Sequence, residues 1–120
     1  MKERVEEISG CRARRVLEAL DGLPGTISVF LEGFSRWVDA RVEVWRAHGL
    51  CRLVRIGFVG LRIWSEMFEV CVLETGDGGV RLLARRVGGV GRLSVDFVVS
   101  LILNRVFEAC PEAEVVGSVG

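Results

Sequence analysis

The chain has 120 residues, half of them hydrophobic, and its 16 basic residues balance 16 acidic ones. One hydrophobic core is the usual solution at this length, so we predict a single domain over residues 1–120, with residues 111–120 as a C-terminal tail. A formal net charge of zero provides no overall field that would attract nucleic acid or anionic lipid, and we expect neither as a partner.

Two further features of the composition concern the source and the location of the protein. Lys2 is the only lysine, Asn104 is the only asparagine, and glutamine is absent. Few thermolabile amides beside many charged residues are typical of thermophilic proteins, although biased codon usage would give the same excess of arginine. Residues 1–8 are charged and contain no apolar signal-peptide core, which predicts a cytoplasmic protein.

The first third of the chain contains short elements. Residues 2–9 are either the start of a helix or an edge strand. The spacing of Val16, Leu17 and Leu20 predicts a short helix over residues 11–20. Thr26 can cap a second short helix that ends at Gly33; a strand is the alternative there, and we favour the helix.

From Ser35 onward, apolar and polar residues alternate, which is typical of a strand with one buried face. The pattern predicts strands within residues 35–46, 50–59, 62–75 and 80–87, separated by turns at 47–49, 60–61 and 76–79. Such short connections make consecutive strands neighbours, so we expect an antiparallel meander of four or five strands.

One long apolar segment follows, over residues 88–111. Its apolar residues have helical spacing, Ser94 or Asp96 can cap the first turn, and Pro111 cannot continue a helix. Asp96, Asn104 and Arg105 interrupt a segment that is already too short for a bilayer, so we expect no membrane span.

The four cysteines, Cys11, Cys51, Cys71 and Cys110, show no CxxC spacing, and with His48 as the single histidine we expect no metal site. We favour four buried free thiols. The alternative is two disulfides: a hairpin that turns at Leu61 places Cys51 opposite Cys71, which leaves Cys11 and Cys110 as the second pair.

The expected order is a strand, two short helices, four or five antiparallel strands and one long helix. This order resembles the helix-grip fold of the START-like superfamily, which includes polyketide cyclase-like and Bet v 1-like proteins. The segments CRARRVLEALDGLPGTISVFLEGFSRWV and GGVGRLSVDFVVSLILNRVFEA carry the resemblance, which suggests a small member of thermophile type. It implies an α+β fold whose curved sheet grips the long C-terminal helix around a hydrophobic cavity.

That fold implies non-catalytic binding or carriage of a hydrophobic small molecule between the sheet and the helix. The candidate apolar lining consists of Trp45, Trp64, Phe68, Phe97 and Leu101, and the candidate polar groups are Arg52, Ser65, Glu66 and Asn104. Arg52 and Glu66 lie on strands that we predict to be adjacent, so a cross-strand ion pair is their expected role.

Two other functions remain open. The chain can be a structural or interaction module with a filled core, which forms a homodimer through an exposed strand or an apolar helix face. It can also be a cyclase-like or hydratase-like enzyme that uses the same cavity. GxSxG and HExxH motifs are absent and His48 falls in a predicted turn, so we expect no catalytic residue and no cofactor.

Overall fold

The computed structural model describes residues 3–60 and 65–119. Within these residues the elements are β1 (Glu3–Ser9), α1 (Ala13–Asp21), β2 (Gly25–Leu31), the 3-10 helix η1 (Glu32–Phe34), β3 (Arg36–Arg46), β4 (Cys51–Phe58), β5 (Ser65–Glu74), β6 (Val80–Gly89), α2 (Val95–Ala109) and β7 (Glu114–Val119).

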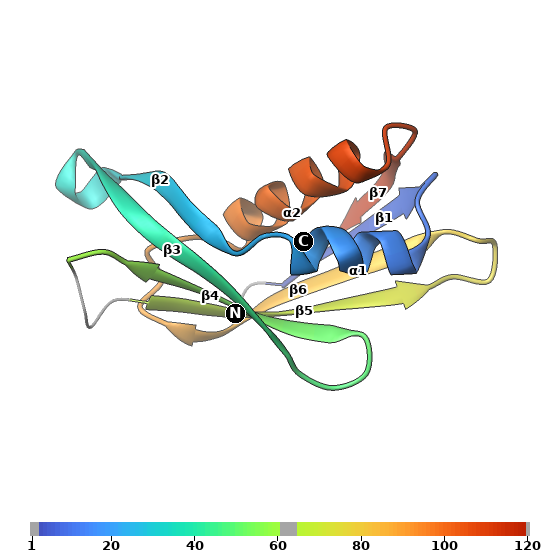
Figure 1. Ribbon diagram of the computed structural model, residues 1–120, viewed down its shortest axis with the longest axis horizontal. Coiled ribbons are helices and arrows are strands. Elements are labelled where there is room, and N and C mark those ends of the chain that lie inside the picture. The colour runs from blue at the N-terminus through green and yellow to red at the C-terminus, as the bar shows by residue number, and fades with distance from the viewer. Residues whose placement is uncertain (1–2, 61–64, 120) are drawn as a thin grey trace.

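The strands form one curved antiparallel sheet with the order β2-β3-β4-β5-β6-β1-β7 (Figure 1). Strands β2 to β6 are consecutive neighbours and form a meander. Strand β1 then lies between β6 and β7, so the two ends of the chain meet on one side of the sheet. Both helices cover the same face of the sheet, and α1 packs against α2 (Figure 1).

The core lies between the helices and the inner face of the sheet. Every second residue of the central strands points inward, as the two-residue period of a strand requires. The fully buried side chains of this layer include Val16, Leu20, Val54, Ile56, Phe68, Val70, Val98 and Ile102. The outer face of the sheet is not covered by a helix, and Trp37 and Trp45 are exposed there.

The predicted helix-grip arrangement is wrong. Helix α2 has 15 residues and is followed by β7, so it is not the C-terminal element, and it packs beside α1 over β1 and β6 rather than within the grip of the sheet. The predicted tail at residues 111–120 contains β7, which pairs with β1. The backbone of β1 therefore pairs with a strand on both sides.

The second short helix is also wrong. Residues 25–31 form β2, which pairs with β3 along its whole length. Thr26, Ile27 and Val29 are β-branched, and the strand that they form satisfies its backbone groups against β3. Seven strands are present in the described residues instead of the five or six expected in all, and β1 lies inside the sheet rather than at its edge.

Other expectations are confirmed. Strands β3 to β6 form the predicted meander, and Cys51 lies directly opposite Cys71. The Ser94 hydroxyl accepts a hydrogen bond from the Phe97 amide at 3.2 Å and so caps α2. In residues 3–60 and 65–119, no helix is long and apolar enough to cross a membrane.

Candidate functional site

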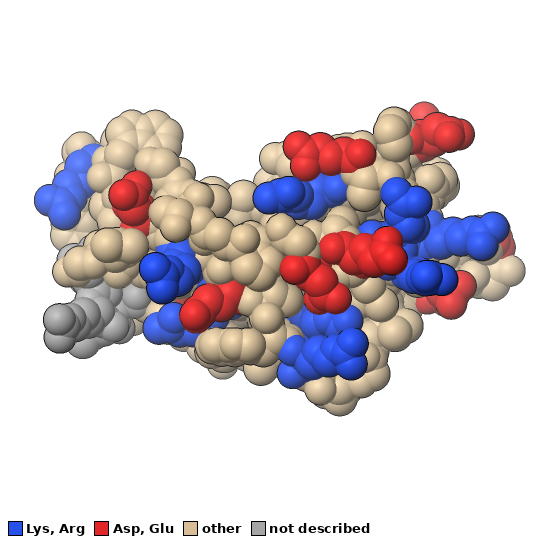
Figure 2. All heavy atoms as spheres, in the orientation of Figure 1, with Lys and Arg blue, Asp and Glu red and all other residues tan. Residues whose placement is uncertain are grey.

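A groove with a volume of about 570 Å³ lies where the end of the β2–η1–β3 hairpin faces the first turn of α2. The hairpin extends away from the helix in Figure 1, and the surface is hollowed between these two segments in Figure 2. Its lining includes Leu31, Phe34, Arg86, Arg92, Leu93 and Phe97. The groove thus opens at one end of the layer between sheet and helices.

Glu66 forms the base of this region. Its carboxylate is fully buried and accepts hydrogen bonds from the backbone amides of Gly91 at 3.1 Å and Arg92 at 2.7 Å. The same carboxylate forms an ion pair with Arg86. Because buried charge is costly without partners, these contacts fix the loop before α2 onto β5.

Arg86 connects the groove to the core. Its guanidinium lies 5.0 Å from the centre of the Phe68 ring and donates a second hydrogen bond to the Leu93 carbonyl oxygen. Arg86 lies opposite Phe68 on the covered face, in the regular register of β5 and β6, and the register shifts by one residue just beyond this pair, between Phe68 and Met67. Arg86 therefore stabilises this wall of the groove through three contacts: the Glu66 carboxylate, the Leu93 carbonyl oxygen and the face of the Phe68 ring.

Gly89 permits this close packing. Its φ is +112°, and a Cβ atom at this position would lie 2.7 Å from the Ser65 carbonyl oxygen. Only glycine adopts that conformation readily and leaves the space that the Glu66 side chain occupies. The sequence GG at 88–89 thus marks a close approach of β6 to β5.

The opposite wall is aromatic and open. Phe34 is 45% exposed, and the Arg92 guanidinium lies 5.5 Å from the centre of its ring. Phe97, on the first turn of α2, is half-buried on the other side of the groove. The groove therefore offers apolar surface for a flat molecule, with the charged group of Arg92 at the rim.

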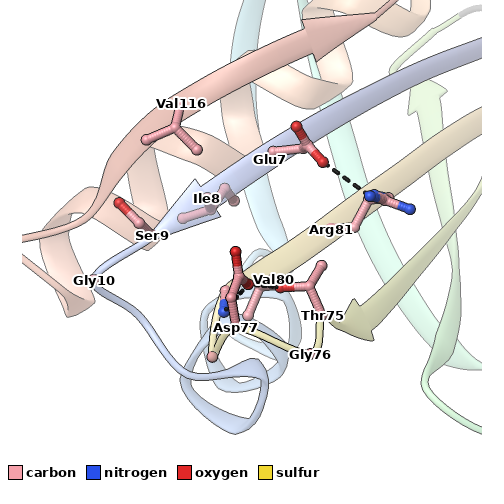
Figure 3. Close-up of a pocket in the computed structure, with 12 residues that line it drawn as sticks. Glu7, Ile8, Ser9, Gly10, Thr75, Gly76, Asp77, Val80, Arg81 and Val116 are labelled. Atoms are coloured by element: carbon pink, nitrogen blue, oxygen red, sulfur yellow. Dashed lines mark hydrogen bonds and ion pairs between the residues drawn. The ribbon is translucent and has the colours of Figure 1, made fainter.

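A second hollow of about 560 Å³ lies beside the β5–β6 turn and the end of β1 (Figure 3). Its polar groups already bind one another: Glu7 pairs with Arg81 at 2.9 Å, and Asp77 accepts hydrogen bonds from Thr75 and from the Gly79 amide. The Thr75 hydroxyl, and then the Gly79 amide, hold the pKa of Asp77 below its usual value. Because these polar groups are already paired with one another, this hollow is the weaker candidate.

Only some of the residues that we predicted to line a cavity lie at or near the groove. Phe97 lines the groove, Glu66 lies beneath it, and Phe68 is fully buried in the core below Arg86. Leu101 is half-buried against the core, and Asn104 is exposed on α2. Ser65 is half-buried at the start of β5, opposite Gly57.

Two of the proposed residues lie away from the groove, and a third is not among the described residues. Trp45 is on the outer face of β3, opposite Leu53 and away from the groove. Trp64 lies outside the described residues. Arg52 is 6% exposed and binds Asp21 at the end of α1, with its Nε 2.8 Å from Oδ1, and this hydrogen bond raises the pKa of the guanidinium.

The predicted cross-strand pair of Arg52 with Glu66 is therefore wrong. The strands are adjacent, but Arg52 lies opposite Val70, and Glu66 lies opposite Ile56. Each charge instead finds its partner outside the β4–β5 hairpin, Arg52 on α1 and Glu66 on β6.

No protein-family model and no curated protein matches this chain. The START-like resemblance stays a prediction, and the function is inferred from the groove itself.

Sequence reasoning missed Phe34, Arg86 and Arg92. Arg86 had a usable signal, since it continues the inward series of Val80, Leu82 and Ala84 in β6. Phe34 lies in the three-residue η1 and Arg92 in the short loop before α2, where no periodicity can show, and only the tertiary fold brings them together.

Proposed function

We propose that this chain binds a small molecule with a flat apolar body and a polar group, without covalent chemistry, in the groove between η1 and α2. The observation that carries the proposal is the exposed Phe34 ring facing a groove of about 570 Å³, beside Arg92. Burial of apolar surface there contributes about 25 cal/mol per Å², and the rim charge orients the polar group.

The surrounding contacts support a preformed site. Glu66 and Arg86 fix the loop before α2, and the Ser94 cap fixes the first turn that carries Phe97. A groove that is already ordered loses little conformational entropy on binding. Glu66 is buried and its carboxylate is fully engaged by Arg86 and backbone amides, so it supports binding better than acid–base catalysis.

The experiment is a fluorescence titration of the purified protein with two probes, anilinonaphthalene sulfonate and the uncharged dye Nile red. We expect saturable binding of at least one probe, and Phe34→Ser should weaken it about tenfold, because a lost aromatic contact costs roughly 1–2 kcal/mol. Phe107→Ser is the matched control, since Phe107 is 39% exposed on α2 and does not line the groove.

Absence of saturable binding by both probes, or equal losses in the Phe34 and Phe107 variants, would contradict the proposal. Mass spectrometry of lipophilic material extracted from the protein then identifies a natural ligand, and its loss from the Phe34→Ser variant would assign it to the groove.

A second candidate function is self-association of a domain with a filled core. The observation that favours it is β2, an edge strand of the described sheet with no charged residue in the segment GTISVFL. Natural proteins usually protect such edges with charge or proline, and an unprotected edge can pair with a second copy of the chain.

A further inference from the structure

The outer face of the sheet brings together four potential metal ligands. His48, Cys51 and Glu69 each offer one donor atom, and these three atoms all lie within 4.8 Å of one another. Cys71 belongs to the same cluster, because its sulfur is bonded to that of Cys51. These ligands form no metal-binding sequence motif, because His48 lies in the β3–β4 turn, Cys51 begins β4, and Glu69 and Cys71 lie on β5.

The backbone fixes the first pair. The Cys51 amide donates a hydrogen bond to the His48 carbonyl oxygen at 2.9 Å, which closes a tight turn with Gly49 at φ +54°. The Ala47 amide also donates to the Cys51 carbonyl oxygen, at 3.2 Å. His48 and Cys51 therefore lie at the two ends of one hydrogen-bonded turn.

The second pair lies on the neighbouring strand. Glu69 and Cys71 are two residues apart on β5, so both side chains point to the outer face. Cys71 is directly opposite Cys51, with their Cα atoms 4.0 Å apart. The Cys side chains thus remain neighbours when the bond between their sulfurs is broken.

A cation also orients the carboxylate. Arg85 Nε lies 2.8 Å from Glu69 Oε1, and Glu69 Oε2 lies 3.4 Å from His48 Nε2. One oxygen is thus held by Arg85 while the other faces the histidine. Such an outer partner is a common feature of metal sites, where it fixes the orientation of a ligand.

We propose that reduction of the Cys51–Cys71 disulfide converts this cluster into a zinc site with His48, Cys51, Glu69 and Cys71 as ligands. A dithiol reductant gives two electrons and two protons to the disulfide and is itself oxidised to a disulfide. Zn²⁺ then displaces the two thiol protons and binds two sulfurs, one imidazole nitrogen and one carboxylate oxygen. A disulfide oxidant reverses these steps: it accepts two electrons from the two thiolates, takes up two protons to become a dithiol, and the re-formed Cys51–Cys71 bridge releases the ion.

The chemistry of the donors fits zinc. Two thiolates, one imidazole and one carboxylate provide the tetrahedral mixture of sulfur, nitrogen and oxygen that zinc accepts. The two thiolates and the carboxylate bring three negative charges to an ion of charge +2, and the neighbouring Arg85 balances the remaining negative charge.

Cys51 is only 7% exposed, so an ion or a reductant reaches the cluster from the side of His48 and the half-buried Cys71. The His48 side chain is 79% exposed, and a hollow of about 120 Å³ beside the cluster is lined by Glu69, Cys71, Leu83 and Arg85, among others. The proposed binding groove lies over the covered face of the sheet, so the two sites are tested independently.

The test uses the whole chain reduced with a phosphine that does not bind zinc, and cobalt(II) as a spectroscopic probe. We expect one equivalent of cobalt to produce thiolate charge-transfer bands and the visible bands of a tetrahedral ion, and zinc to displace it. The oxidised protein should show none of these bands. His48→Ala should weaken zinc binding by more than about tenfold.

Two double variants distinguish the cysteine pairs. Cys11→Ser/Cys110→Ser should keep the cobalt bands after reduction, and Cys51→Ser/Cys71→Ser should lose them. A Cys71→Ser single variant needs no reductant, because it cannot form the cross-strand bridge and retains His48, Cys51 and Glu69; it should bind cobalt more weakly through one thiolate.

Circular dichroism of each variant shows whether the fold is retained. The proposal is overturned by absent thiolate bands in both the reduced chain and the folded Cys71→Ser variant. It is also overturned if the bands survive loss of Cys51 and Cys71, or if His48→Ala leaves zinc affinity unchanged.

Discussion

Glu66 is the residue on which the loop before α2 depends. Its buried carboxylate receives Arg86 and two backbone amides, and it thereby joins β5, β6 and the segment that leads to the helix. Removal of the Glu66 charge leaves the largely buried Arg86 without an anion. An uncompensated buried charge destabilises the folded state.

We therefore predict that Glu66→Gln lowers the free energy of unfolding by about 3–5 kcal/mol. The matched control is Glu43→Gln, because Glu43 pairs with Arg55 at 3.1 Å on the exposed face, where such a pair contributes less than about 1 kcal/mol. Urea unfolding followed by tryptophan fluorescence measures both. Equal losses in the two variants would show that Glu66 is not a special anchor.

At the scale of single residues, the sequence predicted the face of the sheet to which a side chain points more reliably than it predicted contacts between particular side chains. The candidate lining grouped Glu66 with Phe68, and both side chains do lie on the covered face of β5. The supposed Arg52–Glu66 pair failed because the register that aligns Cys51 with Cys71 sets Arg52 opposite Val70. Adjacency of strands does not establish contact between two particular residues.

The disulfides act at the scale of elements. Cys11 and Cys110 join the residues just before α1 to those just after α2 and are 99 positions apart, whereas Cys51 and Cys71 join two neighbouring strands across 20 positions. All four cysteines are paired, contrary to the expectation of free thiols. A bridge that closes a longer loop restricts the unfolded chain more.

We predict that Cys11→Ala/Cys110→Ala lowers the free energy of unfolding by about 1–2 kcal/mol more than Cys51→Ala/Cys71→Ala, from the dependence of loop-closure entropy on length. Guanidinium unfolding under non-reducing conditions measures the difference. A larger loss from the cross-strand pair would mean that native-state contacts, rather than the unfolded chain, determine the stabilisation.

Strong local signals predicted most elements, and pairing between distant segments determined the rest. The alternation in β3 and the helical spacing in α2 are long enough to identify those elements. Residues 25–31 have both helical and strand character, and β3 decides between them. Strand β7 is only six residues long, and it forms because it pairs with β1, which lies more than a hundred positions earlier in the chain.

At the scale of the whole molecule, the sheet determines what each surface can do. One face is covered by α1 and α2, which leaves the groove at one end of that layer, and the other face carries the cluster around Cys51 and Cys71. The sheet is open, so β2 and β7 are edges of the described structure. Acidic and basic side chains are interspersed on the face shown in Figure 2, which gives no long-range repulsion between copies.

The two edges differ in a way that predicts how copies would associate. Strand β2 has no charge, and its Phe30 lies opposite Trp37 of β3, with the ring centres 5.5 Å apart. The two residues are 44% and 67% exposed. An antiparallel pair of β2 strands from two copies satisfies their backbone groups and covers these rings around a two-fold axis. We therefore expect a dimer whose population rises with protein concentration.

Ser28→Lys places a charge at the middle of β2 and should shift the protein to monomer, because antiparallel pairing of two copies would bring two like charges close together across the strands. Val116→Lys is the control on the other edge, since Val116 is 63% exposed on β7 and should leave the dimer intact. Sedimentation equilibrium measures both. A wild-type monomer at every concentration would exclude self-association, and equal dissociation by the two variants would mean that β2 is not the interface.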